Sequence, residues 1–189
     1  MTTSIMIVGV GGQGTLLASR ILGSALVSEG YDVKVSEVHG MSQRGGSVVT
    51  YVKFGDKVYS PVIEKGEADI ILSFEQLEAA RWLPYLKPDG KLIVNTQKID
   101  PMTVVTGAAK YPDNVLETLS ATGVDLITLD SLSLALKAGS AKAVNVVLIG
   151  AMASKTDIAK DKWLKAVEEN VPPKFKELNL KAFELGYNS

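Results

Sequence analysis

Apolar and amphipathic stretches alternate along the first 154 residues of the chain. Short apolar runs closed by glycine or polar residues predict strands buried on both faces, and apolar positions three and four residues apart predict helices. The expected strands cover residues 5–8, 33–35, 69–73, 92–94 and 124–129. The expected helices cover residues 16–29, 75–86, 114–122, 131–137 and 141–154. Strands that alternate with helices indicate the α/β class, with a mainly parallel sheet and helical crossovers.

The alternation is interrupted after the second expected strand. Residues 47–54 alternate with period two, Gly55-Asp56 fits a two-residue type II′ turn, and residues 57–60 return as a second strand. We therefore predict a β-hairpin insertion where a crossover helix is usual. Residues 96–112 predict no single structure, although Val104-Val105 fits a short strand.

The last 34 residues predict two amphipathic helices. Asp161 can cap the first, Pro172-Pro173 ends it, and an apolar stripe marks the second, formed by Phe175, Leu178, Ala182 and Leu185. We therefore divide the chain into a main α/β domain, residues 1–155, and C-terminal helices, residues 156–189. Packing of these helices on the chain's own core is favoured over packing on a partner.

Composition and charge exclude several classes of protein. The chain has no cysteine, which excludes disulfides, cysteine-ligated iron–sulfur clusters and thiol nucleophiles. With one histidine and no cysteine, a structural zinc site is not expected. A net charge of −1 argues against a nucleic-acid binder. The longest apolar stretch, residues 143–153, is too short to span a bilayer, and no signal peptide is evident, so we expect a cytoplasmic protein.

A glycine loop lies between the first expected strand and the first helix. Gly9, Gly11 and Gly14 match the dinucleotide fingerprint of Rossmann-like folds. In that pattern the first glycine permits the tight turn, the second lets a pyrophosphate approach, and the third allows close packing. Glu37 comes 23 residues after Gly14, near the position that binds a ribose. A phosphate loop of the Walker type is excluded because Thr15, not lysine, follows Gly14.

A second polar, glycine-bearing loop covers residues 37–46. Arg44, followed by Gly45-Gly46, can place a guanidinium beside bare backbone N–H groups, a receptor for phosphate or carboxylate. His39 can act as a general acid or base, but hydrogen bonding or interface work is favoured for it. Met41 is interpreted as an interface contact.

From the residues alone, several functions stay open. The glycine loop fits a stand-alone NAD(P)-dependent dehydrogenase, a flavoprotein, or a nucleotide-binding regulatory module. It also fits a turn that binds no ligand. No catalytic dyad is evident outside residues 37–46, which weighs against the dehydrogenase.

Taken together, segments 9–14 and 37–48 resemble the gamma-type small subunit of 2-oxoacid:ferredoxin oxidoreductases, and the 39–46 stretch favours the indolepyruvate branch. The resemblance covers roughly residues 4–150. It implies a Rossmann-like subunit that assists oxidative decarboxylation of a 2-oxoacid to an acyl-coenzyme A, with reduction of ferredoxin. Its implied ligand or partner contacts are Gly9, Gly11, Gly12, Gln13, Gly14, Glu37, His39, Met41, Ser42, Gln43, Arg44, Gly45 and Gly46.

The same resemblance implies a division of labour among subunits. Thiamine diphosphate, its magnesium and the [4Fe–4S] clusters are expected on a large partner subunit, and coenzyme A is a candidate contact of this chain. Ferredoxin is reached through the complex. The isolated chain is expected to be inactive and able to form a homodimer, with no nucleic-acid or membrane partner.

Overall fold

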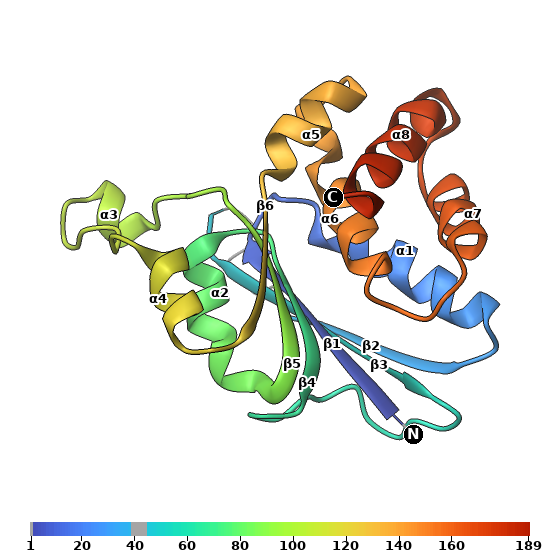
Figure 1. Cartoon of the computed structure of the whole chain (residues 1–189), viewed down its shortest axis with the longest axis horizontal. Helices are drawn as coiled ribbons and strands as arrows, with labels where there is room; N and C mark the ends of the chain where they lie inside the picture. Colours follow the sequence, from blue (N-terminus) through green and yellow to red (C-terminus); the bar gives the residue numbers. More distant parts are fainter. Residues whose placement is uncertain (1, 39–44) are drawn as a thin grey trace.

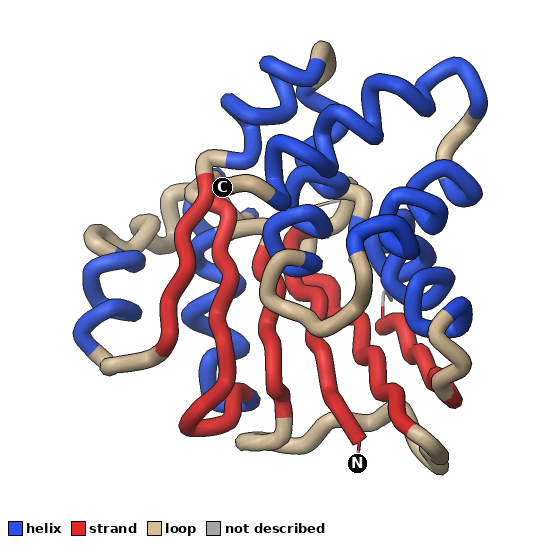
Figure 2. The backbone as a smooth tube through the Cα atoms, turned by 45° about the vertical axis from the view of Figure 1, so that its right-hand side comes forward, coloured by secondary structure: helices blue, strands red, loops and turns tan. Residues whose placement is uncertain are grey.

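The computed structural model describes residues 2–38 and 45–189. These residues form a six-stranded sheet in the order β2-β3-β1-β4-β5-β6, with helices on both faces (Figures 1 and 2). The strands are β1 (Thr2–Val10), β2 (Asp32–Val38), β3 (Ser47–Gly55), β4 (Ala68–Ser73), β5 (Leu86–Asn95) and β6 (Asp125–Leu129). The expected α/β fold is confirmed.

The helices follow the order that the periodicity predicts. They are α1 (Thr15–Ser28), α2 (Gln76–Trp82), α3 (Met102–Val105), α4 (Val115–Ala121), α5 (Ser131–Ala138), α6 (Val144–Ala153), α7 (Lys160–Asn170) and α8 (Lys176–Tyr187). Within residues 2–38 and 45–189, short 3₁₀ segments adjoin them at η2 (Leu83–Tyr85), η3 (Ala141–Ala143) and η4 (Pro173–Phe175). Within the described part of the chain, no helix is long and apolar enough to cross a membrane.

The structure contains an antiparallel hairpin after the second predicted strand, but the hairpin is formed by other strands than those predicted. β3 lies between β1 and β2 and pairs antiparallel with both, whereas β1, β4, β5 and β6 are parallel. The hairpin therefore joins β2 to β3, and the prediction that residues 57–60 return as its second strand is wrong. Both edges of β3 are already occupied, so those residues have no edge to pair with. They run as irregular backbone, held where Val58 N–H donates to Asp32 Oδ2 at 2.9 Å.

Three local predictions also need correction. Val104-Val105 is the end of helix α3 and not a strand. The strand expected at residues 92–94 is longer, since β5 begins at Leu86; Gly90 lets β5 approach Ala68, where an added Cβ would lie 2.9 Å from the Ala68 carbonyl oxygen. Ala159, not Asp161, occupies the N-cap of α7, and Asp161 lies in the first helical turn, where its negative charge interacts favourably with the helix dipole.

Two hydrophobic cores flank the sheet, each under the helices that cover that face; Figure 1 shows these helices on the two sides of the sheet. On one face, Ile5, Ile7 and Leu72 pack under α1, α5, α6, α7 and α8. On the other face, Met6 and Val8 pack with residues of α2 and α4. The alternation of neighbouring β1 residues between the two cores is the expected property of a strand buried on both faces.

The C-terminal helices pack on the chain's own core. Trp163 of α7 and Phe183 of α8 are fully buried in the same core as α1 and α6. α6 and α8 cross in close contact at two glycines: an added Cβ on Gly150 or Gly186 would lie 2.2 or 1.9 Å from backbone of the other helix. The proposed boundary near residue 155 stays a prediction, since the two parts share this core.

Candidate functional site

The glycine loop at residues 9–14 and residues 45–46 lie together at the edge of the sheet where the parallel strands end. After β1 the chain enters α1 on one face, and after β4 it enters α2 on the other face. The adjacent strands β1 and β4 therefore diverge to opposite sides, which opens a crevice at their carboxyl ends. Such a switch point is where open α/β sheets bind ligands.

The positions occupied by glycine in residues 9–14 require it for different structural reasons. Positive φ angles occur at Gly12 (102°) and Gly14 (84°), so the turn is made there. Gly9 lies inside β1, where an added Cβ would be 2.9 Å from Phe74 Cβ. An added Cβ on Gly14 would lie 2.7 Å from Asn145 Nδ2, so this glycine admits a side chain of α6 to the loop.

The two loops singled out from the sequence are joined by backbone hydrogen bonds. Gly11 N–H donates to Gly46 C=O at 2.8 Å, and Gly45 N–H donates to Gly11 C=O at 3.2 Å. Gly11 N–H is therefore engaged within the protein and does not face a pyrophosphate. The remaining candidates of the second loop lie outside the described residues: His39, Met41, Ser42, Gln43 and Arg44.

Glu37 lies on β2, one strand farther from β1 than in the dinucleotide pattern. Because β3 separates β1 from β2, the two strands are roughly 10 Å apart at ordinary sheet spacing. One oxygen of the Glu37 carboxylate accepts a hydrogen bond from Ser19 Oγ of α1 at 2.7 Å. This placement weakens the interpretation of Glu37 as a ribose ligand.

Three carboxamide side chains connect the ends of β1, β4 and β5. Gln13 accepts from Val10 N–H at 2.7 Å and donates to Phe74 C=O at 3.0 Å. Asn95 donates to the same carbonyl at 3.1 Å and accepts from Ser131 N–H, at the start of α5, at 3.3 Å. Gln97 Oε1 accepts from Gln13 Nε2 at 3.3 Å and from Asn95 Nδ2 at 3.4 Å.

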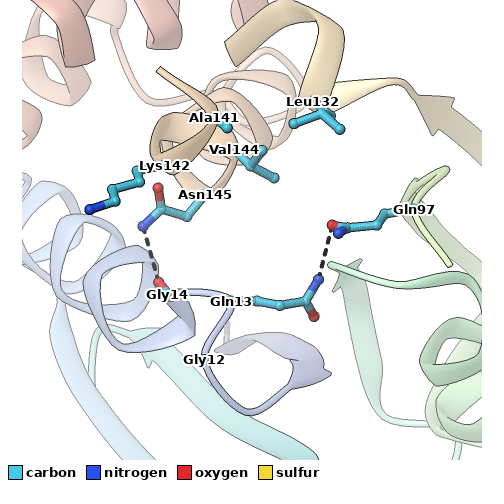
Figure 3. Close-up of a pocket in the computed structure, with 9 residues that line it drawn as sticks. All are labelled: Gly12, Gln13, Gly14, Gln97, Leu132, Ala141, Lys142, Val144 and Asn145. Atoms are coloured by element: carbon cyan, nitrogen blue, oxygen red, sulfur yellow. Dashed lines mark hydrogen bonds between the residues drawn. The ribbon is translucent and has the colours of Figure 1, made fainter. Parts of the chain in front are cut away.

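This network borders a cavity of about 530 Å³, which we call the amide cavity (Figure 3). In Figure 3, Gln13 and Gln97 meet on one side, and Asn145 donates to Gly14 C=O at 3.2 Å on the other. The loop before α1 and residues at the starts of α5 and α6 border it. N–H groups at a helix start favour anions, but those of α5 are largely engaged, since Ser131 N–H donates to Asn95 and Ser133 N–H donates to Asp130. The cavity is lined by Gly12, Gln13, Gly14, Gln97, Leu132, Ala141, Lys142, Val144 and Asn145.

A second polar group, the carboxylate cluster, lies on the α2 side of the sheet. Glu75, 1% exposed, caps α2 by accepting from Glu78 N–H at 3.0 Å and also accepts from Ile99 N–H at 3.2 Å and from Tyr111 Oη–H. Burial, followed by the neighbouring Glu75 carboxylate, raises the pKa of Tyr111. Tyr111 is therefore a hydrogen-bond donor to Glu75 at neutral pH.

Glu78 completes the carboxylate cluster. It accepts hydrogen bonds from Ser47 Oγ and, at 3.3 Å, from Trp82 Nε1, and Arg81 Nε lies 3.4 Å from its other oxygen. Burial raises the pKa of Glu78 despite these contacts. Because Ser47 follows Gly45-Gly46 directly, Glu78 anchors this end of the second loop beside a cavity of about 360 Å³.

Sequence reasoning missed the residues that shape both places. Asn145 could have been identified from the sequence, because it is the one amide in an otherwise apolar stretch. Asn95 could also have been identified, because it is a polar residue at the end of a buried strand. Glu75, Glu78 and Tyr111 carry no sequence pattern that marks them as a cluster, and only the fold brings them together. In the described residues no group of three or more His, Cys, Asp or Glu side chains is arranged to hold a metal ion.

Comparison with known proteins places these features in a family context. A sequence profile described as pyruvate ferredoxin/flavodoxin oxidoreductase matches residues 4–189. Over 188 residues the chain is 43% identical to the indolepyruvate oxidoreductase subunit IorB of Thermococcus kodakarensis, a match that covers 97% of this chain and 93% of that protein.

Two solved structures extend the comparison. The gamma subunit of a keto/oxoacid ferredoxin oxidoreductase from Geobacter sulfurreducens superposes with a TM-score of 0.73 at 27% identity, covering 98% of this chain and 96% of that one. The 2-oxoglutarate:ferredoxin oxidoreductase from Magnetococcus marinus, with 2-oxoglutarate, coenzyme A and succinyl-CoA bound, gives a TM-score of 0.75 at 19% identity. That match covers 99% of this chain and 30% of the other, and at this identity it shows a shared fold.

Proposed function

Since the chain belongs to the pyruvate ferredoxin/flavodoxin oxidoreductase family, we propose that it is the IorB-like subunit of an indolepyruvate:ferredoxin oxidoreductase. The complex would decarboxylate an aryl 2-oxoacid, releasing carbon dioxide, and transfer the remaining acyl group to coenzyme A while the two electrons reduce ferredoxin. The observation that carries the proposal is the 43% identity to an IorB subunit across nearly the full length of both chains. A second support is the favoured indolepyruvate branch of the resemblance in residues 37–48.

The redox cofactors belong to a partner in this proposal. The chain has no cysteine, so it offers no thiolate ligand for a [4Fe–4S] cluster, and these clusters do not fit this subunit. We assign the clusters, thiamine diphosphate and its magnesium to a large partner subunit, through which ferredoxin is reached. The complex is expected in the cytoplasm.

The contribution of this chain is a contact with coenzyme A at the amide cavity. Gln13 and Gln97 lie on one side of the cavity (Figure 3). Leu132 and Val144 add apolar surface on the other side, next to the polar side chains of Lys142 and Asn145. Coenzyme A combines phosphates and amide carbonyls with a flexible alkyl arm, which matches both sides. The described residues that line the amide cavity include no carboxylate that would repel the phosphates.

The first experiment is an anaerobic affinity purification of the tagged chain from its native host. We expect a cysteine-rich partner to co-purify with iron and thiamine diphosphate, and the eluate to reduce a viologen dye with indolepyruvate only when coenzyme A is added. An eluate that contains no partner protein, iron or thiamine diphosphate would contradict the proposal. So would NAD(P)-dependent oxidation of a substrate by the chain alone, which would favour the dehydrogenase alternative.

The residues of the second loop are assigned to the partner's active site within the same proposal. We expect Arg44→Ala to lower turnover of the assembled complex without preventing assembly, because a guanidinium there binds a phosphate or carboxylate. Assembly is measured by gel filtration and turnover by dye reduction. Unchanged turnover would remove Arg44 from the site and leave the subunit assignment intact.

A further inference from the structure

The orientation of each carboxamide in the network is determined by backbone groups. A backbone N–H can only donate and a carbonyl can only accept, so each fixes which end of an amide faces it. Gln13 lies between Val10 N–H and Phe74 C=O, and Asn95 lies between Ser131 N–H and Phe74 C=O. Both therefore present an NH₂ group toward the centre of the network.

Gln97 receives hydrogen bonds from both of these NH₂ groups. Its oxygen must face them, because an NH₂ in that position would oppose two donors. The Nε2 amide of Gln97 is thus the end turned away from the network. No residue in ranges 2–38 and 45–189 accepts a hydrogen bond from it, although Gln97 lines the amide cavity.

We propose that Gln97 is a ligand-binding residue whose Nε2 amide donates a hydrogen bond to an acceptor oxygen of the acyl acceptor in the amide cavity. Gln13 and Asn95 are positioning residues that hold this donor in one orientation. The inference rests on the proposed function, because coenzyme A is the acceptor assigned to the cavity. The shared chemistry is a phosphate or amide carbonyl oxygen, and both occur in coenzyme A.

The Gln97→Glu variant tests the hydrogen bond to the ligand without removing the acceptor that Gln13 and Asn95 use. A glutamate keeps an oxygen for Gln13 and Asn95, but it replaces the free NH₂ with a second oxygen. In the assembled complex we expect the KM for coenzyme A to rise at least tenfold, while the KM for indolepyruvate changes less than twofold. The thermal unfolding midpoint of the isolated chain should stay unchanged. A KM for coenzyme A within twofold of the wild-type value overturns the inference.

Leu132→Asp is the matched variant on the opposite wall. Leu132 is 40% exposed and lies in the first turn of α5, where a carboxylate is favourable for the helix. If this variant raises the KM for coenzyme A and Gln97→Glu does not, the role of Gln97 is refuted and the cavity assignment stands. If neither variant changes it, the coenzyme A contact itself fails.

Pantetheine as the acyl acceptor distinguishes the two sources of the acceptor oxygen. If Gln97 donates to an amide carbonyl, Gln97→Glu should raise the KM for pantetheine by the same factor as for coenzyme A. If it donates to a phosphate, the variant should affect coenzyme A alone.

Discussion

The amide cavity and the carboxylate cluster are both polar, and both lie at the carboxyl edge of the sheet, but they differ in how completely their groups are paired. Every carboxylate oxygen of Glu75 and Glu78 has a partner, supplied by Tyr111, Ser47 and others. In the amide cavity, the Nε2 amide of Gln97 has none among the described residues. The first arrangement holds the chain together as a structural clamp, and the second leaves a donor for the ligand that we propose binds there.

The two regions also differ in the chemistry of their polar groups, which are carboxylates in the cluster and neutral amides at the cavity. Buried carboxylates are stable only when donors surround them, so the carboxylate cluster is closed by necessity. Neutral amides can be left partly unpaired at a water-filled cavity at small cost, because water satisfies them until a ligand displaces it. Changes to the side chains of the carboxylate cluster should therefore affect stability, and changes to the polar side chains of the amide cavity should affect binding.

The largest effect is expected from Glu75→Ala. The change leaves the donors of Ile99, Glu78 and Tyr111 without their acceptor, which should lower the free energy of unfolding by about 3–5 kcal/mol. Urea denaturation of the isolated chain measures the loss. Glu117→Ala, at an exposed carboxylate of α4, is the control and should cost no more than about 0.5 kcal/mol. Equal costs for the two variants would mean that the clamp is not structural.

The next effect is expected from Gly14→Ala, on the cavity side. The new Cβ would combine a positive φ with a contact 2.7 Å from Asn145, and should cost about 2–3 kcal/mol. Gly12→Ala has a positive φ but open space around its Cβ, and should cost about 1 kcal/mol. Thermal or urea unfolding compares the two, and an equal loss would show that Asn145 simply moves aside.

A smaller effect concerns the pH dependence of stability in the carboxylate cluster. Because burial raises the pKa of Glu78, the folded protein holds its proton more tightly than the unfolded chain does. This contribution to stability is complete below the ordinary value of 4.5 and is lost as pH rises through the raised pKa. The wild type should therefore lose stability relative to Glu78→Gln over that interval. Parallel pH profiles of unfolding free energy would contradict the raised pKa.

The smallest effect on stability is expected from Lys142→Ala. Lys142 is exposed at the rim of the amide cavity, so the unfolding free energy should change by less than about 0.5 kcal/mol. In the complex, loss of its charge should raise the KM for coenzyme A about two- to fivefold at low salt, an effect that added salt reduces. A stability loss as large as that of Glu75→Ala would reverse the comparison of the two regions.

Much of the site was predictable, but not all of it. The glycine loop and residues 45–46 were identified from the sequence because closely spaced glycines after a buried strand indicate a tight turn or a close backbone approach, and the structure joins them through Gly11. The dinucleotide interpretation of Glu37 depended on β2 lying beside β1. Hydrophobic periodicity reports which face of a strand is buried but not which strand is its neighbour, so the position of β3 was beyond it.

By itself, the sequence determined the α/β fold, the first strand–loop–helix unit, the absence of cluster ligands and the family resemblance, because each depends on local patterns or residue types. Only the tertiary structure decided that Gln13, Asn95 and Gln97 orient one another and that Tyr111 reaches Glu75. The Tyr111–Glu75 contact joins residues 36 positions apart, and the Gln13–Gln97 contact joins residues 84 positions apart. Asn95 is close to Gln97 in the sequence and donates to the same oxygen as Gln13 does. Which side chains meet at that separation depends on strand order and crossover direction, which no local pattern encodes.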